Sequence, residues 1–345
     1  MKSKSLSVIT SKQYSIDIFG KKLIMKKHFL FVVLFYLLLI GCSSDEKPIE
    51  TVVNGIEHGA FLRTLQINNS EFSIDNLESN FSVDIQEQDE EDGGLLQSVN
   101  VYVRFLDNTI ATGDFSTSEV LIQTLQPSDF SPGSFDLPIT TIDYTFNELL
   151  ETTGIEHNIV ECKDQFIIRL ELNLSNDFVF SNHNASACIL GFDTFFGSPF
   201  IYTINIVEPI ENELFTGTYL YESILDGPFG PTFGEPFLVE VTNGHSPNVR
   251  TVKFDNFPLR LPRTYRFSIV CDELIFEKNQ LRYNTLNSPC GEDGQPILLG
   301  PDTVNSTINP LDDSVFEIWF VEGYLGWDGV FGFGTVPSRI RLTKQ

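Results

Sequence analysis

The chain has 345 residues and a formal net charge of −25, because 47 acidic residues stand against 22 basic ones. An acid excess of this size argues against nucleic acid as a partner, since binding phosphates requires a basic face. An acidic exterior instead favours solubility and attracts divalent cations or basic partners.

The first distinctive segment is a basic stretch, residues 25–28, followed by 12 apolar residues, 29–40, and by Gly41-Cys42. A basic region, an apolar run and a small residue at its end are the parts of a secretory signal. The apolar run is too short for a transmembrane helix, which needs about 20 residues. We therefore expect a signal peptide at residues 1–41, with Met25 as its natural start, and a polar tether at residues 42–56.

Removing residues 1–41 takes away seven lysines and one aspartate, which leaves a net charge of −31. Besides Cys42, the remaining chain has four cysteines: Cys162, Cys188, Cys271 and Cys290. Four cysteines permit three connectivities. The separations of 26 and 19 residues between neighbouring cysteines favour one loop-closing disulfide in each half of the chain. Each such loop would stabilise the fold by about 3 kcal/mol in the chain-entropy model.

From residue 59 the chain consists of short segments rich in Phe, Val, Ile and Thr, which are separated by Gly, Pro, Asn and Asp. Apolar and polar residues alternate most clearly in residues 81–85, 99–105, 166–172 and 202–206. This period of two buries one face of a strand and exposes the other. The pattern predicts an all-β fold. One helical turn is expected at residues 145–152, where Thr145 and Glu148 have the spacing of a capping box.

The length after residue 41 suits two domains. We expect an immunoglobulin-like β-sandwich at residues 57–207, because seven or eight strands fit that architecture. Residues 208–213 contain Pro209 and charged residues, as a short linker does. For residues 214–345, which have more glycine and proline per strand, a second β-sandwich, a jelly roll and a small β-barrel fit equally well.

Signatures of catalysis are missing from the sequence. It contains no Gly-x-Ser-x-Gly elbow, no phosphate-binding glycine-rich loop before a lysine and no His-Glu-x-x-His motif. We therefore expect no catalytic residues and no enzymatic activity. A hydrolase that uses two carboxylates stays an alternative, because the separation of such a pair is a property of the fold.

An acidic segment at residues 86–94 includes Asp89, Glu90, Glu91 and Asp92 and ends in two glycines. Calcium binds carboxylate and carbonyl oxygens from flexible loops, so these four residues are candidate Ca²⁺ ligands. The alternative is a solvated hairpin tip without a metal.

A second unusual segment, residues 323–334, alternates glycine with aromatic residues. Its Tyr324, Trp327 and Asp328, together with Arg263 and Arg266 from a basic span, are candidate residues for binding a glycan or a peptide. The alternatives are that the aromatic residues pack in the core and that the arginines balance the acidic surface.

The sequence Leu39-Ile40-Gly41-Cys42 resembles the lipobox of bacterial lipoproteins, which are cleaved before a cysteine that then carries the lipid. Ser43-Ser44-Asp45-Glu46 resembles the surface-export signal of Bacteroidota lipoproteins. The resemblance implies that Cys42 is lipidated and anchors the protein to the outer membrane, facing the cell exterior.

Residues 59–64 and 88–94 are similar to those of a recurring type of Bacteroidota lipoprotein with an immunoglobulin-like domain. Such proteins resemble accessory lipoproteins of outer-membrane nutrient importers or of other outer-membrane complexes. The resemblance implies an accessory or scaffold subunit with an outer-membrane protein as its partner. A glycan- or peptide-binding lipoprotein of a nutrient-uptake system is the alternative.

Overall fold

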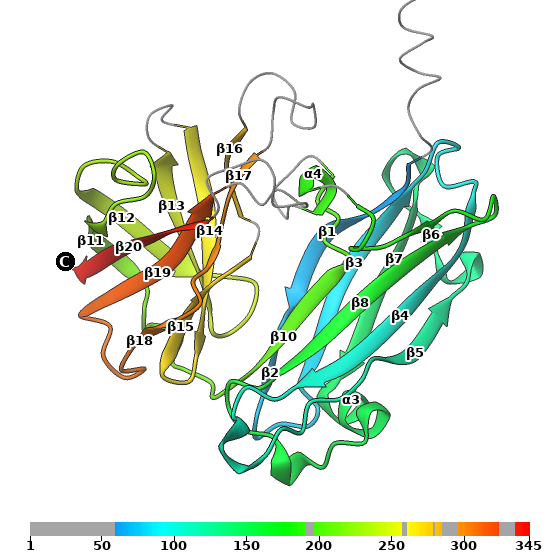
Figure 1. Ribbon diagram of the computed structural model, residues 1–345, viewed down its shortest axis with the longest axis horizontal. Helices are drawn as coiled ribbons and strands as arrows, with labels where there is room; N and C mark the ends of the chain where they lie inside the picture. Colours follow the sequence, from blue (N-terminus) through cyan, green and yellow to red (C-terminus); the bar gives the residue numbers. More distant parts are fainter. Residues whose placement is uncertain are drawn as a thin grey trace, which may run out of the picture. The chain divides into compact units, whose positions relative to one another are not determined.

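Extended strands form nearly all of the regular structure, as the alternation in the sequence predicts (Figure 1). The computed structural model describes residues 59–185, 187–190, 196–256, 261–278, 280–284, 296–323 and 335–345. The predicted all-β fold class is confirmed. In this described part of the chain, no helix is both long and apolar enough to span a bilayer.

The first half of the folded chain is a sandwich of two sheets. One sheet has the strand order β1 (Phe61–Asn69), β3 (Asn80–Gln88), β7 (Pro138–Thr145), β6 (Ser131–Pro132). The other has the order β2 (Glu71–Ser73), β10 (Ile201–Val207), β8 (Gln165–Leu174), β4 (Leu96–Leu106), β5 (Val120–Leu125), with β9 (Val179–Phe180) also paired to β8. Burial alternates along β4 and β8, so one face of their sheet packs inward.

This strand order is that of an immunoglobulin sandwich, with A-B-E-D in one sheet and G-F-C-C′ in the other. The short strand β2 continues the chain after β1 and pairs in parallel with β10 at the edge of the second sheet. Antibody domains join strands B and F by a disulfide. Here the equivalent strands β3 and β8 contain no cysteine and bury apolar residues instead, among them Val83, Ile85, Ile168 and Leu170.

The helix predicted at residues 145–152 is α3 (Phe146–Thr153), which connects the two sheets between β7 and β8. Its capping box is formed: Glu148 donates its backbone N–H to Thr145 Oγ1 over 3.2 Å, and Thr145 donates its own N–H to the Glu148 carboxylate over 2.8 Å. The helix is more than a connecting turn, because Phe146 is buried and stacks on Phe72 of β2 with the ring centroids 5.0 Å apart.

The second half is a single ten-stranded sheet. Its strand order is β16 (Gln280–Asn284), β17 (Pro296–Pro301), β19 (Val315–Gly323), β20 (Thr335–Lys344), β11 (Gly217–Leu225), β12 (Phe237–Asn243), β13 (Val249–Asn256), β14 (Leu261–Val270), β15 (Glu273–Phe276), β18 (Ser306–Thr307). All of the neighbouring strands are antiparallel.

The ten-stranded sheet curls back on itself. Near one end, Ser306 of β18 donates its hydroxyl to the backbone carbonyl of Glu317 in β19 over 2.7 Å. The Gln280 side chain of β16 pairs with the backbone N–H and C=O of Arg266 in β14, over 2.6 and 2.8 Å. Of the three architectures expected for this half, the half-barrel shape is nearest to the small barrel.

Aromatic rings fill the inside of the curled sheet, and Phe233 and Phe254 stack with their centroids 4.0 Å apart. One ion pair lies within this core: Arg282 and Glu322 contact each other, and both are 0% exposed. Thr232 donates its hydroxyl to the second oxygen of the Glu322 carboxylate over 2.9 Å. The period-two pattern alone does not predict this buried pair, because it places charged residues outside.

Residues 58–345 form one compact unit that contains two hydrophobic cores. The first core ends at Ile206 and the second begins at Phe215, so the expected linker at residues 208–213 lies between them. The cores are joined by a disulfide between Cys162 and Cys271, whose Cα atoms are 6.3 Å apart. Beside it, Lys163 forms ion pairs with Asp272 at 2.6 Å and Glu273 at 2.9 Å.

The predicted pairing of cysteines within each half is therefore wrong for Cys162 and Cys271. These residues are 109 positions apart, and the fold brings together the loop before β8 and the turn between β14 and β15. Sequence spacing favours short loops, because their closure costs little entropy, whereas the packed strands set the actual distance. The side chain of Cys188 and all of Cys290 lie outside the described residues.

Candidate functional site

A groove with a volume of about 570 Å³ lies on the outer side of the curled sheet. Alternation along β19 explains part of its lining, since Phe316, Ile318 and Phe320 are buried while Glu317 and Trp319 are partly exposed. The groove is lined by Glu222, Ser306, Thr307, Val315, Phe316, Glu317, Trp319, Arg341 and Thr343. We call it the Trp319 groove.

The Trp319 groove follows from an incomplete pairing of β19. This strand pairs with β20 along its whole length, from Val315 to Gly323. Its other edge pairs with β17 only from Phe320 onward. Along residues 315–319, no described strand pairs with that second edge, and Ser306 donates its hydroxyl to the backbone carbonyl of Glu317 there. The groove thus lies at the seam where the curled sheet stops short of closing.

Charged side chains form a row across the strands beside the groove. Arg341 of β20 lies opposite Glu222 of β11 on one side and opposite Glu317 of β19 on the other. Arg341 Nη2 is 2.9 Å from Glu317 Oε1. Partial burial works to raise the pKa of Glu317, but hydrogen bonds from Trp319 and Arg341 outweigh it, so this pKa lies below its ordinary value.

The indole of Trp319 is held from two directions. Its Nε1–H donates to Glu317 Oε2 over 3.0 Å. The guanidinium carbon of Arg339 lies 3.9 Å from the ring centroid, in a cation–π contact over one face. These contacts keep the ring oriented beside the groove, so a ligand would meet an aromatic surface that needs little ordering.

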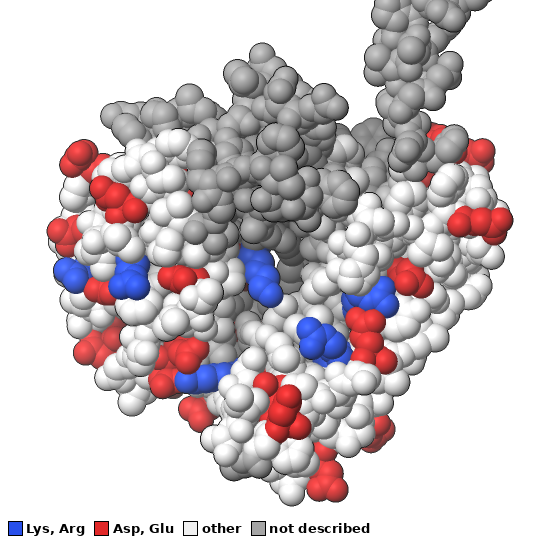
Figure 2. All heavy atoms as spheres, in the orientation of Figure 1, with Lys and Arg blue, Asp and Glu red and all other residues white. Residues whose placement is uncertain are grey.

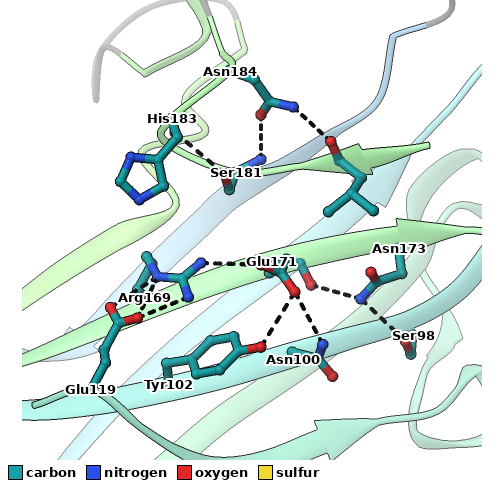
Figure 3. A network of polar contacts seen from close by, with 11 residues as sticks. Ser98, Asn100, Tyr102, Glu119, Arg169, Glu171, Asn173, Ser181, His183 and Asn184 are labelled. Carbon is teal, nitrogen blue, oxygen red and sulfur yellow. Dashed lines mark hydrogen bonds and ion pairs between the residues drawn. The ribbon is translucent and has the colours of Figure 1, made fainter.

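A second polar surface covers the outer face of β4 and β8 in the first sandwich (Figure 3). Arg169 forms hydrogen bonds of 2.9 to 3.0 Å with both carboxylate oxygens of Glu119, and its guanidinium lies 4.2 Å from the ring centroid of Tyr102. Glu171 accepts hydrogen bonds from Asn100 and Tyr102 over 3.2 and 3.3 Å. The hydrogen bonds to Glu119 are the main reason that the pKa of Arg169 is raised. Arg169 is thus paired with two carboxylates, those of Glu119 and Glu171, which leaves one net negative charge on an ordered surface.

The edge strand β5 borders this surface. Among the described strands, only β4 pairs with β5, and Figure 1 shows β5 at the margin of its sheet. Its residues, Val-Leu-Ile-Gln-Thr-Leu, carry no charge, and the side chains of Val120 and Leu121 are 39% and 51% exposed. Glu119, the residue before the strand, is bound by Arg169. An uncharged edge strand can accept a further strand.

The acidic turn at residues 89–94 has a structural explanation. The carboxylate of Asp89 accepts backbone N–H groups from Glu91, Gly93 and Leu95 over 2.7, 2.9 and 2.8 Å. Within the described ranges, no three His, Cys, Asp or Glu side chains are grouped to share an ion. The predicted calcium site at Asp89, Glu90, Glu91 and Asp92 therefore gains no support, since Asp89 already uses its oxygens to shape the turn.

Two glutamates are buried without full hydrogen bonding. Glu87, before the acidic turn, is 0% exposed, and burial, followed by the charge of Asp89 and a hydrogen bond to its side chain, raises the pKa of Glu87 to about 8. Glu71 is 2% exposed and lies where the two cores meet. Its Oε2 accepts the backbone N–H of Asn248 over 2.9 Å, while its Oε1 has no partner.

Burial is the main cause that raises the pKa of Glu71 to about 8. The N–H of Asn248 and the charge of Arg250 lower this pKa, and the charge of Glu277 raises it. Nearby, the ring of His245 is 2.9 Å from Ser70 Oγ, and burial lowers the pKa of this imidazole. The junction between the cores thus buries polar and titratable groups, and the carboxyl group of Glu71 is protonated there at neutral pH.

The glycan or peptide site predicted from the sequence is not assembled in the described residues. Tyr324, Trp327 and Asp328 lie outside them, as does Cys42. Arg263 and Arg266 are three residues apart in β14 and therefore project to opposite faces of the strand. Arg266 binds Glu277 over 2.8 Å.

Sequence reasoning missed the residues of the Trp319 groove. The alternation in residues 315–321 was a usable signal, because it places Glu317 and Trp319 on one face of a strand. The partners Arg341, Glu222 and Thr307 come from three other strands, and only the sheet order brings them alongside.

Comparison of the sequence with models of known protein families and with curated proteins found no match. Function is therefore inferred from the residues and surfaces described above.

Proposed function

We propose that this protein is a lipid-anchored accessory or scaffold subunit of an outer-membrane complex, attached through Cys42 and facing the cell exterior. In this role the folded residues bind a protein partner and carry out no reaction. Three observations support the proposal: the disulfide between the cores, the distribution of surface charge, and the open edge of the first sandwich.

The disulfide between Cys162 and Cys271 carries the proposal. Disulfides persist in oxidising compartments and are rare in the cytosol. The bond therefore supports export, which the signal segment at residues 25–42 predicts independently. Because this disulfide joins the two cores, it restricts their movement relative to each other. It therefore supports a binding protein with fixed surfaces more than an enzyme that opens and closes around a substrate.

Surface charge limits which partners can bind. Figure 2 shows carboxylates spread over the visible face of the described residues, with lysines and arginines between them and no broad basic patch. A partner protein binds to such a surface most favourably where the side chains are uncharged or where their charges are already paired. Strand β5 and the Arg169 surface beside it meet this condition, because β5 is uncharged and Arg169 is paired with Glu119. We propose that this edge contacts the outer-membrane partner.

Membrane fractionation tests the anchor. The wild-type protein should sediment with the outer membrane, and Cys42→Ala should appear in the soluble fraction. Retention of Cys42→Ala in the membrane would refute lipid anchoring at this residue.

Purification from membranes in mild detergent tests the partner. The wild-type protein should bring down a membrane protein in a fixed ratio, and Leu121→Lys in β5 should lose it. Leu238→Lys is the matched control, because Leu238 is 61% exposed on β12, in the other half of the chain. Recovery of the wild-type protein alone, or equal loss in both variants, would contradict the proposed contact.

A further inference from the structure

The Trp319 groove is an open, mainly polar groove whose size is that of a small-ligand site. Its volume of about 570 Å³ falls in the range of about 300 to 1,000 Å³ that such sites occupy. Its lining combines an aromatic ring, two carboxylates, a guanidinium and hydroxyl groups in one place. We propose that this groove binds a neutral saccharide.

The indole supplies the apolar contact that a sugar ring needs. One side of a pyranose ring presents C–H groups, which pack on an aromatic face. Arg339 occupies one face of the Trp319 ring, and Glu317 holds its N–H, so the ring cannot turn freely. Trp319 nevertheless borders the groove, and its orientation is set before a ligand arrives. Such preorganisation lowers the entropy cost of binding.

The polar groups of the groove match the hydrogen bonding of hydroxyls. A sugar hydroxyl both donates and accepts hydrogen bonds. The carboxylates of Glu222 and Glu317 accept them, Arg341 donates them, and the hydroxyls of Thr307 and Thr343 can do both. A purely apolar ligand would leave these groups desolvated and unpaired, at a cost in binding free energy.

The charges of the groove select a neutral sugar over an acidic one. Neither of the two guanidiniums beside the groove is left for an anionic ligand, because Arg341 is paired with Glu317 and Arg339 stacks on Trp319. A uronate or a sulfate ester would therefore gain no unpaired cation here, in a protein that is strongly acidic as a whole.

An extended peptide is a less suitable ligand for the same groove. A peptide would bind by adding a strand to the open edge of β19 at residues 315–319. The hydroxyl of Ser306 already occupies the backbone carbonyl of Glu317 in the middle of this edge. A saccharide uses the side chains outside that edge and does not need this carbonyl.

This inference is independent of the proposed scaffold function, because the groove belongs to the curled sheet and β5 belongs to the first sandwich. A protein that holds a membrane partner and fails to bind sugars would refute only the inference made here. A protein that binds sugars and has no partner would refute only the scaffold proposal.

The test is isothermal titration of the full-length protein in detergent with cellohexaose, laminarihexaose, xylohexaose, maltohexaose and, as an acidic counterpart, hexagalacturonic acid. At least one of the neutral oligosaccharides should bind, and hexagalacturonic acid should not. Trp319→Ala should weaken that binding about tenfold or more, because it removes the aromatic surface. Leu238→Ala, an exposed change on β12, should leave it unchanged.

A second variant keeps the test decisive if Trp319→Ala does not fold. Thr307 is exposed and lines the groove, so Thr307→Trp should fill it without disturbing the core and should abolish binding. Thermal unfolding of each variant checks that the fold is intact. Failure of all four neutral oligosaccharides to bind, unchanged binding by Thr307→Trp, or preferential binding of hexagalacturonic acid would each overturn the proposal.

Discussion

Replacing Glu71 by glutamine should raise the free energy of unfolding relative to wild type, and this gain should grow as the pH rises. Glu71 is buried where the two cores meet, and its pKa is raised from 4.5 to about 8, chiefly by burial. At neutral pH its carboxyl group is therefore protonated in the folded protein and ionised in the unfolded chain. Glutamine has nearly the same shape, still accepts the Asn248 N–H and does not titrate.

The sign and size of the effect follow from proton linkage. Between pH 4.5 and pH 8 the folded state binds a proton at Glu71 that the unfolded state has lost, so stability decreases as pH rises. The stabilisation is complete below pH 4.5 and is lost as pH rises through about 8. At about 1.4 kcal/mol per pH unit, wild type should lose about 3 to 4 kcal/mol between pH 5 and pH 8 through this group. Glu71→Gln should not lose this amount.

Urea unfolding of wild type and Glu71→Gln at pH 5, 6, 7 and 8 measures the difference, with the disulfide kept intact. The contributions of all other titrating groups cancel when the two proteins are compared at each pH. We expect similar unfolding free energies at pH 5 and a gap in favour of the variant that widens with each pH unit. Parallel pH profiles would refute the reasoning, because they would mean that Glu71 has the same pKa in both states.

Three further predictions concern the other unusual contacts. Glu87→Gln should show the same widening gap with rising pH in urea unfolding, because the pKa of Glu87 is also raised to about 8 by burial and by Asp89; a pH-independent effect would count against this. The double variant Cys162→Ser/Cys271→Ser should lower the unfolding free energy by about 4 to 5 kcal/mol, the loop-closure value for a bond that spans 109 residues. Peptide mapping without reduction should first detect the Cys162–Cys271 link in the wild type, and a different link would contradict the fold. Arg282→Met should destabilise the curled sheet by about 3 to 5 kcal/mol, because it leaves Glu322 charged and buried without its partner. The double variant Arg282→Met/Glu322→Leu should recover most of this loss in thermal unfolding, and equal loss in both variants would show that the ion pair is not the cause.

Local patterns decided a large part of this fold. The alternation in residues 166–172 predicts strand β8, and the capping box at Thr145 and Glu148 predicts helix α3, because both depend on neighbours within a few positions. The sequence also predicts that Arg263 and Arg266 lie on opposite faces of their strand, because they are three residues apart. The signal segment and the acid excess are likewise properties of sequence alone.

The tertiary structure decided every feature that joins distant parts of the chain. Cys162 pairs with Cys271 and not with a near cysteine, because packed strands bring the loop before β8 to the turn after β14. Glu71 is buried because a residue 177 positions later, Asn248, packs against it. The Trp319 groove exists because the ten-stranded sheet curls without full closure and so brings Thr307, Glu317 and Arg341 together. Spacing along the chain predicts on which face of a strand a side chain lies. Strand order and sheet curvature determine which other residues that face contacts.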